Sequence, residues 1–313
     1  MKRYLMKFSV FLILCLAIFL LINRLYTNTN YWKSENNVYK FNNIPDDIEL
    51  ANVGSSHAVF AFKYDAIPYI KAFNFALAAQ PYFYDYAVLN KYISHMAENA
   101  VVLIPISYFG ITRGERYSLF RKRYYRFLNR DEMDYWSFKE YLIYAKYPVL
   151  SAGINKTRLF RDMTAKQISP FYNHDSHLEE DKIYDYCLAK YEEWTSPDLE
   201  QGQKGYEHNI QAVSKIIDLC YSHKLQPVLI STPVTDVLNS IFEEDKDFFT
   251  TFDKFGRDLC KKYSGLVFLD YSRSRDFSNK HELFADGDHL NNAGSELFTK
   301  DVVKELKMLG LLR

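Results

Sequence analysis

Short apolar runs alternate with amphipathic helical patterns along most of this chain. The runs lie at 48–53, 72–76, 101–106, 226–231 and 266–271. Each run has the length of one buried strand, and the segments between them are long enough for crossover helices. Strands that alternate with helices form a parallel sheet covered on both faces, and such a sheet binds ligands at the carboxyl ends of its strands. The sequence therefore predicts an α/β fold, a three-layer sandwich with a parallel sheet.

The helices are expected between these runs. They cover residues 57–67, 82–98, 206–223, 242–263 and 293–309, and a polar loop covers 272–280. From about 112 to 203 the pattern changes, because aromatic and charged residues alternate densely and no strand is predicted. We interpret 112–203 as a mostly helical insertion or cap over the substrate side of the sheet. Its basic run at 121–126 is typical of a solvated helix face, and binding of an anionic polymer is the alternative there.

The first residues carry the signals of a membrane anchor. Lys2, Arg3 and Lys7 precede an apolar run at 8–22 that approaches the roughly 20 residues needed to span a bilayer. Because positive charge is concentrated on the N-terminal side, the tail is expected in the cytoplasm and the rest of the chain outside it. A cleaved signal peptide is the alternative, although the residues after the run offer no small-x-small cleavage site.

These signals divide the chain into three parts. We predict a single-pass transmembrane helix at 1–25, followed by a polar stalk at 26–45 that is rich in Asn, Thr and Ser. One folded domain then occupies 46–313 and contains the insertion. The predicted location is the cell membrane, with the folded domain extracytoplasmic.

Composition limits the partners and cofactors. The 313 residues are 48% hydrophobic and 25% charged, and their formal net charge is zero. Nothing in this balance points to nucleic acid. Outside the apolar run, Cys187, Cys220 and Cys260 lie in helical surroundings, where cysteine usually serves as a small buried hydrophobe. No pair has metal-site spacing, so we expect no metal, no other cofactor and at most one disulfide.

Two short motifs at opposite ends of the folded domain point to a split serine hydrolase site. Gly54-Ser55-Ser56-His57 follows the first apolar run, and Asp286-Gly287-Asp288-His289 precedes the last predicted helix. A serine hydroxyl is a weak nucleophile at neutral pH, so it needs a base within hydrogen-bond reach and a third group to orient that base. Ser56 on the bend after a strand, with His289 as base and Asp286 as its orienting acid, meets these needs.

Neighbouring residues offer alternatives for each role. Ser55 is the rival nucleophile, although within the loop it would otherwise accept or donate local hydrogen bonds. His57 is interpreted as a pocket or helix-start residue, since it is adjacent to Ser56 on a sharp turn and points elsewhere. Asp288 does not share a face with His289, so it is the weaker acid and is expected to cap the turn or the following helix.

The two motifs resemble the blocks of the GDSL/SGNH hydrolase family. Gly54-Ser55-Ser56-His57 corresponds to the first block, and Asp286 with His289 matches the family's Asp-x-x-His. The Ser-Ser-His form and the ending Asp-Gly-Asp-His-Leu-Asn are similar to membrane-anchored members that handle acyl groups of cell-envelope polymers, as in alginate O-acetylation and D-alanyl transfer to teichoic acid. The resemblance covers roughly 46–308 and implies a flavodoxin-like SGNH sheet.

Two middle blocks of that family are missing. Its second block supplies a glycine N–H to the oxyanion hole, whereas the comparable stretch here, 73–80, contains no glycine, and Ala76 is the candidate donor. Its third block supplies an asparagine, and after the run at 101–106 Ser107 is the candidate replacement. With Ser55 and His57, these residues are the oxyanion or pocket candidates.

The resemblance implies an esterase or an O-acyltransferase that acts through a covalent Ser56 ester. The expected substrate is an acylated cell-surface polysaccharide or polymer, or a small ester. A separate multi-span membrane acyltransferase is the expected partner, and the N-terminal helix is the contact with the membrane. The alternative is a degenerate SGNH-like domain that binds polysaccharide or scaffolds a membrane acyltransferase complex.

Overall fold

The computed structural model describes residues 1–108, 110, 120–151, 178–195 and 203–312. By their contacts, the residues form two compact units. The first unit comprises Met1–Asn43 and Phe120–Tyr172, and the second comprises Ile44–Leu119 and Asn173–Arg313. Parts of the predicted insertion at 112–203 lie outside the described residues.

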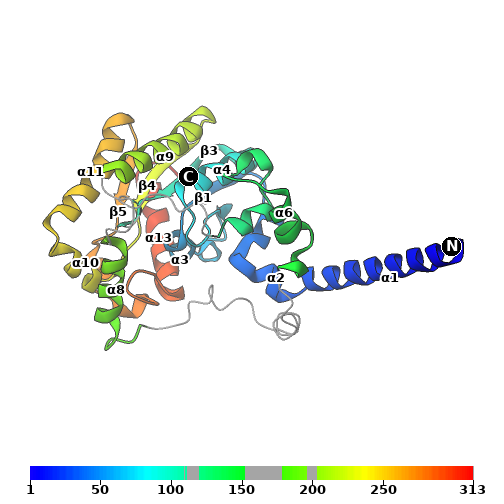
Figure 1. Ribbon diagram of the computed structural model, residues 1–313. Coiled ribbons are helices and arrows are strands. Elements are labelled where there is room, and N and C mark those ends of the chain that lie inside the picture. Colours follow the sequence, from blue (N-terminus) through cyan, green and yellow to red (C-terminus); the bar gives the residue numbers. More distant parts are fainter. Residues whose placement is uncertain (109, 111–119, 152–177, 196–202, 313) are drawn as a thin grey trace. The chain divides into compact units, whose positions relative to one another are not determined.

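A five-stranded parallel sheet forms the centre of the second unit (Figure 1). The strand order is β2-β1-β3-β4-β5, which is the flavodoxin-like order. This confirms the predicted α/β fold with a parallel sheet. The strands are β1 (Ile48–Asn52), β2 (Ala72–Asn74), β3 (Met96–Pro105), β4 (Gln226–Ser231) and β5 (Val267–Asp270).

Helices cover both faces of this sheet (Figure 1). On one face α3 (Ser56–Ala61) packs against α13 (Asn292–Met308), and on the other α4 (Tyr82–Tyr92) packs against α9 (Gln203–Ser222), which also contacts α11 (Lys246–Lys262). Alternate residues of the central strands point to the two faces, so both are apolar. The remaining helices of this unit are η2 (Tyr64–Ala66), η3 (Ile93–His95), α8 (Ile183–Thr195), α10 (Asp236–Glu243), α12 (Arg275–Ser278) and η9 (His281–Leu283).

The core between the sheet and the α3–α13 layer explains why these segments fold together. Leu50, Leu103 and Ile230 point from three adjacent strands toward Phe298 of α13, and all four are almost fully buried. Burying such side chains contributes about 1.5–3 kcal/mol each. The packing holds the start of α3 and the start of α13 beside the carboxyl ends of the strands, where ligands of such sheets bind.

Three helix predictions were wrong in their boundaries. The helix expected over 57–67 ends at Ala61, because Phe62 is extended, and the short helix η2 follows it. The helix expected over 82–98 ends at Tyr92, because β3 begins at Met96 and its first residue pairs with Ile48 of β1. The helix expected over 242–263 is two helices, α10 and α11. Asp245 begins the second one, because its side chain accepts the N–H of Asp247. The polar loop at 272–280 also contains the short helix α12.

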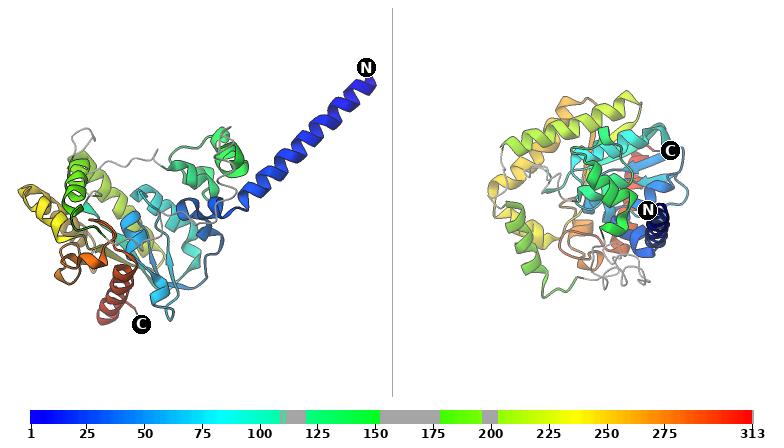
Figure 2. Two further views of the ribbon diagram at one scale, coloured as in Figure 1. Left: turned by 90° about the horizontal axis from the view of Figure 1, so that it is seen from below. Right: turned by 45° about the vertical axis from the view of Figure 1, so that its right-hand side comes forward.

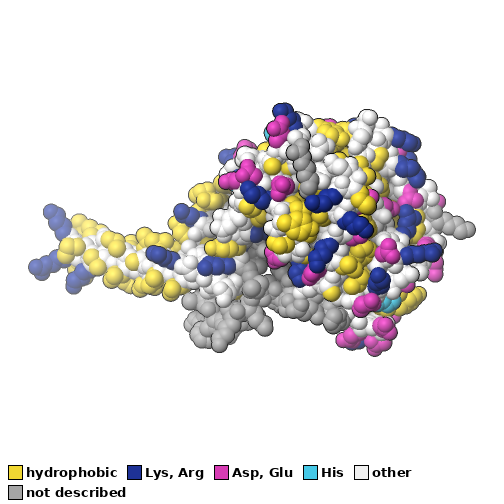
Figure 3. All heavy atoms as spheres, turned by 180° about the vertical axis from the view of Figure 1, so that it is seen from behind, with side chains coloured by type: hydrophobic (Ala, Val, Ile, Leu, Met, Phe, Trp, Pro, Cys, Tyr) yellow, Lys and Arg dark blue, Asp and Glu magenta, His cyan; other side chains and the backbone are white. Residues whose placement is uncertain are grey.

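The first unit contains α1 (Lys2–Thr27), the one helix of the described residues that is long and apolar enough to cross a membrane. It is a single continuous helix in the left view of Figure 2. Apolar side chains run along it, with Lys and Arg at its N-terminal tip (Figure 3). The other elements of this unit are α2 (Asn30–Ser34), η1 (Glu35–Asn42), η4 (Arg121–Arg126), η5 (Arg130–Glu132), α6 (Phe138–Tyr141), the π-helix η6 (Leu142–Lys146) and η7 (Pro148–Leu150).

The basic run at 121–126 is not the solvated helix face that its pattern predicts. Arg123 is buried, and the guanidinium of Arg126 stacks on the ring of Trp32 at 3.9 Å. Arg121 forms an ion pair with Asp134. Aromatic rings stabilise guanidinium groups that leave water, so the dense mixture of aromatic and basic residues folds into the interior of the first unit.

Candidate active site

Gly54 sets the turn that presents Ser56. It follows β1 with φ of +120°, a backbone conformation that glycine adopts more readily than other residues. A Cβ at this position would lie 2.8 Å from Cγ of Pro105 and 2.9 Å from Cβ of Ala58. The Gly54 N–H donates to Oδ1 of Asp85 at 2.7 Å. The strand therefore ends in a tight, anchored turn, and Ser56 becomes the first residue of α3.

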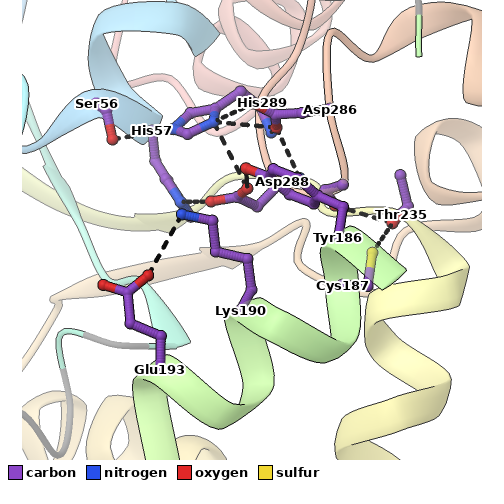
Figure 4. A network of polar contacts seen from close by, with 11 residues as sticks. Ser56, His57, Tyr186, Cys187, Lys190, Glu193, Thr235, Asp286, Asp288 and His289 are labelled. Atoms are coloured by element: carbon purple, nitrogen blue, oxygen red, sulfur yellow. Dashed lines mark hydrogen bonds and ion pairs between the residues drawn. The ribbon is translucent and has the colours of Figure 1, made fainter. Parts of the chain in front are cut away.

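Ser56, His289 and Asp286 lie in one chain of hydrogen bonds (Figure 4). The Nδ1 atom of His289 lies 3.0 Å from each carboxylate oxygen of Asp286, and its Nε2 atom lies 2.9 Å from Oγ of Ser56. Because a carboxylate only accepts, Nδ1 carries the proton and Nε2 accepts the Ser56 hydroxyl. The structure thus brings together the three residues predicted as nucleophile, base and acid, in an arrangement suited to activating the serine.

Asp286 also shapes the loop that carries His289. Its Oδ1 atom accepts the backbone N–H of Asp288 at 3.0 Å and that of His289 at 2.8 Å. The turn and the orientation of the imidazole therefore depend on the same carboxylate. A second anchor comes from Thr235, which caps the N-terminus of α10: both its backbone N–H and its hydroxyl donate to the carbonyl oxygen of Gly287, at 3.1 and 2.8 Å.

Asp288 has a different place from the one expected from sequence. It caps neither the turn, which Asp286 closes, nor α13, where Asn291 accepts the N–H of Gly294. The Asp288 carboxylate is buried instead, and Oδ2 accepts the Nε2–H of His57 at 2.9 Å. The hydroxyl of Tyr186 donates to Oδ1 at 2.6 Å. Sequence position beside His289 did not reveal this, because both donors come from distant parts of the chain.

Burial and charge set the ionisation of this network. For His289, burial lowers the pKa, but the carboxylates of Asp288 and Asp286 outweigh it and the pKa is raised above its ordinary value of 6.5. For Asp288, burial raises the pKa, but His289 and the hydrogen bond from His57 outweigh it and the pKa is lowered. Burial lowers the pKa of His57 despite its contact with Asp288. A neutral His57 therefore faces an ionised Asp288.

Helix α8, from the predicted insertion, packs directly on the Asp286–His289 loop. A Cβ added at Gly287 would lie 2.4 Å from Sγ of Cys187 and 2.9 Å from Cδ1 of Tyr186. Burial raises the pKa of the Cys187 thiol to about 11, as befits a packed core residue. Sequence reasoning missed Tyr186 as a site residue. The sequence feature that could have pointed to Tyr186 is the four-residue spacing of Tyr186, Lys190 and Trp194, which places the three side chains on one face of a helix.

The oxyanion and pocket candidates lie around the serine turn and at the neighbouring strand ends. Ser55 immediately precedes α3, and its carbonyl oxygen accepts the N–H groups of Ala58 and Val59. The N–H of Ala76 donates to Oδ1 of Asn74 at 3.0 Å, and Ser107 is buried just after β3. Ala76 would have to release this bond to act as an oxyanion donor. Its role and those of the other candidates stay predictions.

One cluster has the composition of a metal site. Ligand atoms of His57, Asp288 and His289 lie within 4.8 Å of one another. These side chains are already hydrogen-bonded, His57 to Asp288 and His289 to Ser56 and Asp286. The polar network thus explains why these three side chains lie together. That the site holds no metal stays a prediction. All four cysteines lie in the described part of the chain, and no disulfide joins them.

Comparison with known proteins adds little to this geometry. No family model and no curated protein matches the chain. A Streptococcus pneumonia protein provisionally described as a platelet activating factor is 12% identical, with a TM-score of 0.43 over 93% of this chain and 99% of its own. A Bacteroides fragilis protein provisionally described as an acylhydrolase is 10% identical, with a TM-score of 0.42 over 88% and 96%. Likeness at this level carries no argument about activity.

Proposed function

We propose that this protein is a serine-dependent acyl-ester hydrolase or O-acyltransferase of the SGNH type. The observation that carries the proposal is the hydrogen-bonded chain from Ser56 through His289 to Asp286. It lies beside the carboxyl end of β1, where parallel sheets bind ligands. The flavodoxin-like strand order agrees with the fold that the resemblance to this family implies.

The reaction follows from the direction of these hydrogen bonds. Oγ of Ser56 attacks the acyl carbonyl carbon while its proton moves to Nε2 of His289, and the carbonyl electrons move to the oxygen. The intermediate then collapses, the bond to the leaving alcohol breaks, and His289 returns the proton to that alcohol. An acyl ester remains on Ser56. Asp286 holds the ring of His289 by Nδ1 throughout.

The second half of the reaction decides between two activities. If water attacks the acyl-Ser56 ester, the protein is an esterase or deacetylase; if a sugar hydroxyl attacks, it is an O-acyltransferase. In either case His289 takes the proton of the attacking hydroxyl and returns it to Oγ of Ser56. The N-terminal anchor supports a cell-surface polymer as substrate and a domain outside the cytoplasm. A multi-span membrane acyltransferase would then supply the acyl group.

Ester turnover tests the proposal directly. The full-length chain in detergent is assayed with a chromogenic acetate ester, and Ser56→Ala is compared with Ser55→Ala. Loss of the nucleophile should lower kcat by about 10³-fold or more, because only binding and oxyanion contacts remain. Ser55→Ala should keep a measurable fraction of the activity. Equal turnover by wild type and Ser56→Ala would leave the polysaccharide-binding or scaffolding alternative as the better account.

The choice between hydrolysis and transfer needs an acceptor. The same variants are incubated with an acyl donor ester and an oligosaccharide, and acylated sugar is measured against free acid. A transferase should form acylated sugar in amounts that depend on Ser56, since its site must favour the hydroxyl over water. Release of free acid alone would identify an esterase.

A further inference from the structure

The Asp288 carboxylate lies between the two histidines of the site (Figure 4). Only 2% of its side chain is exposed, and both oxygens have donors, Oδ2 from His57 at 2.9 Å and Oδ1 from Tyr186 at 2.6 Å. The same Oδ1 atom lies 3.6 Å from Nδ1 of His289. His289 therefore faces two carboxylates on its Nδ1 side.

The two carboxylates differ in how much of their charge reaches His289. Asp286 is 28% exposed to solvent, and its Oδ1 atom already accepts two backbone N–H groups. Water and these amides attenuate its field. Asp288 is shielded from water, and charges interact more strongly where the local dielectric is low. The carboxylate that lies farther from Nδ1 is thus the less screened of the two.

We propose that Asp288 is a second positioning residue for His289. Its carboxylate, held by His57 and Tyr186, stabilises the His289 imidazolium that forms when Ser56 gives up its proton. This rests on the proposed function. In the attack step the proton leaves Oγ of Ser56 for Nε2 of His289, so a positive charge appears on a ring that Asp286 and Asp288 both face. Asp288 itself takes no proton and touches no substrate.

His57 and Tyr186 explain how a buried carboxylate stays in place. A buried charge is unfavourable unless hydrogen bonds replace its water, and two donors from two elements, α3 and α8, provide them. The groups that act on His289 are Asp286 and Asp288 on its own loop, Ser56 and His57 from α3, and Lys190 from α8, while Tyr186 of α8 contacts Asp288. The amine of Lys190 pairs with Glu193 at 3.6 Å, and its charge lowers the pKa of His289.

The experiment measures His289 in the absence of turnover. Full-length chain in detergent is labelled with ¹³C-histidine, and the titration of His289, assigned with His289→Gln, is followed by NMR in wild type and Asp288→Asn. Removing the negative charge should lower the His289 midpoint by about one pH unit or more, which equals about a tenfold change in proton affinity. The acidic limb of kcat/KM for the acetate ester should move to lower pH by the same amount.

Matched variants separate charge from structure. Asp236→Asn is the control, because Asp236 also accepts from a histidine, His281 at 2.7 Å, but lies outside this network; it should leave the His289 midpoint unchanged. Asp288→Glu keeps the charge, so its His289 midpoint should stay close to that of wild type. Asp288→Ser replaces Asp288→Asn if the latter unfolds.

The outcomes separate the two proposals. An unchanged His289 midpoint in the folded, neutral Asp288 variant would overturn the role of Asp288, whatever the activity. If Ser56→Ala leaves ester turnover intact, the proposed function fails and the role of Asp288 in the reaction fails with it. A shifted midpoint that is mirrored in a Ser56-dependent pH profile supports both.

Discussion

At the residue scale, His289 lies between the carboxylates of Asp286 and Asp288, which raise its pKa above 6.5. As a base it must be neutral to accept the Ser56 proton. Activity should therefore be lost as the pH falls through this raised value, so the acidic limb of kcat/KM should lie above pH 6.5. A pH profile of wild-type ester turnover measures this. A limb at or below 6.5 would show that the carboxylates do not act on His289 as described.

Gly54 is the second residue whose role can be tested alone. Gly54→Ala should destabilise the fold by about 1–3 kcal/mol from the positive φ and about 1–3 kcal/mol more from the contacts with Pro105 and Ala58. Gly265→Ala is the matched control, since Gly265 also has positive φ but no neighbour within 4 Å of an added Cβ. Thermal unfolding should show a clearly larger loss for Gly54→Ala. Equal losses would mean that the turn has room for a side chain.

At the element scale, the packing of α8 on the Asp286–His289 loop should control the geometry of the site. Gly287→Ala places a methyl group against Sγ of Cys187 and should push the loop and α8 apart, which lowers kcat/KM by about 10- to 100-fold. Adding Cys187→Ala removes the closest contact and should restore part of the activity, while Cys187→Ala alone serves as the control. No recovery in the double variant would place the damage elsewhere in the loop.

At the scale of the whole molecule, helix α1 contacts later residues of the first unit. The side chain of Asn23 donates to the carbonyl oxygen of Lys146 at 3.2 Å, and the ring of Phe19 lies 5.4 Å from that of Tyr147. Cleavage after the apolar run would remove these contacts. We therefore expect the protein in the membrane fraction with residues 1–25 retained, and protease added outside spheroplasts should digest the domain. Soluble protein in the medium that lacks these residues would show a cleaved signal.

The sequence determined the fold class and the identity of the residues that meet at Ser56. Strands and helices differ in apolar period, so the alternation that ends in β5 and α13 can be read locally. Asp286 and His289 are three residues apart, so their contact is a property of one turn. The carboxyl ends of parallel strands meet at one edge of the sheet, and β1 leads from that edge into α3. The sheet therefore brings this turn to Ser56.

Only the tertiary structure shows that Asp288 is a second carboxylate beside His289 and which donors it accepts from. It alone also shows that the basic run at 121–126 is partly buried. Asp288 receives hydrogen bonds from His57 and Tyr186, which are 231 and 102 residues away in sequence. Such contacts depend on how helices pack over a sheet, and no local period encodes them. Arg126 likewise has a partner that its own pattern does not reveal, because the ring of Trp32 that stacks on its guanidinium lies 94 residues away in sequence.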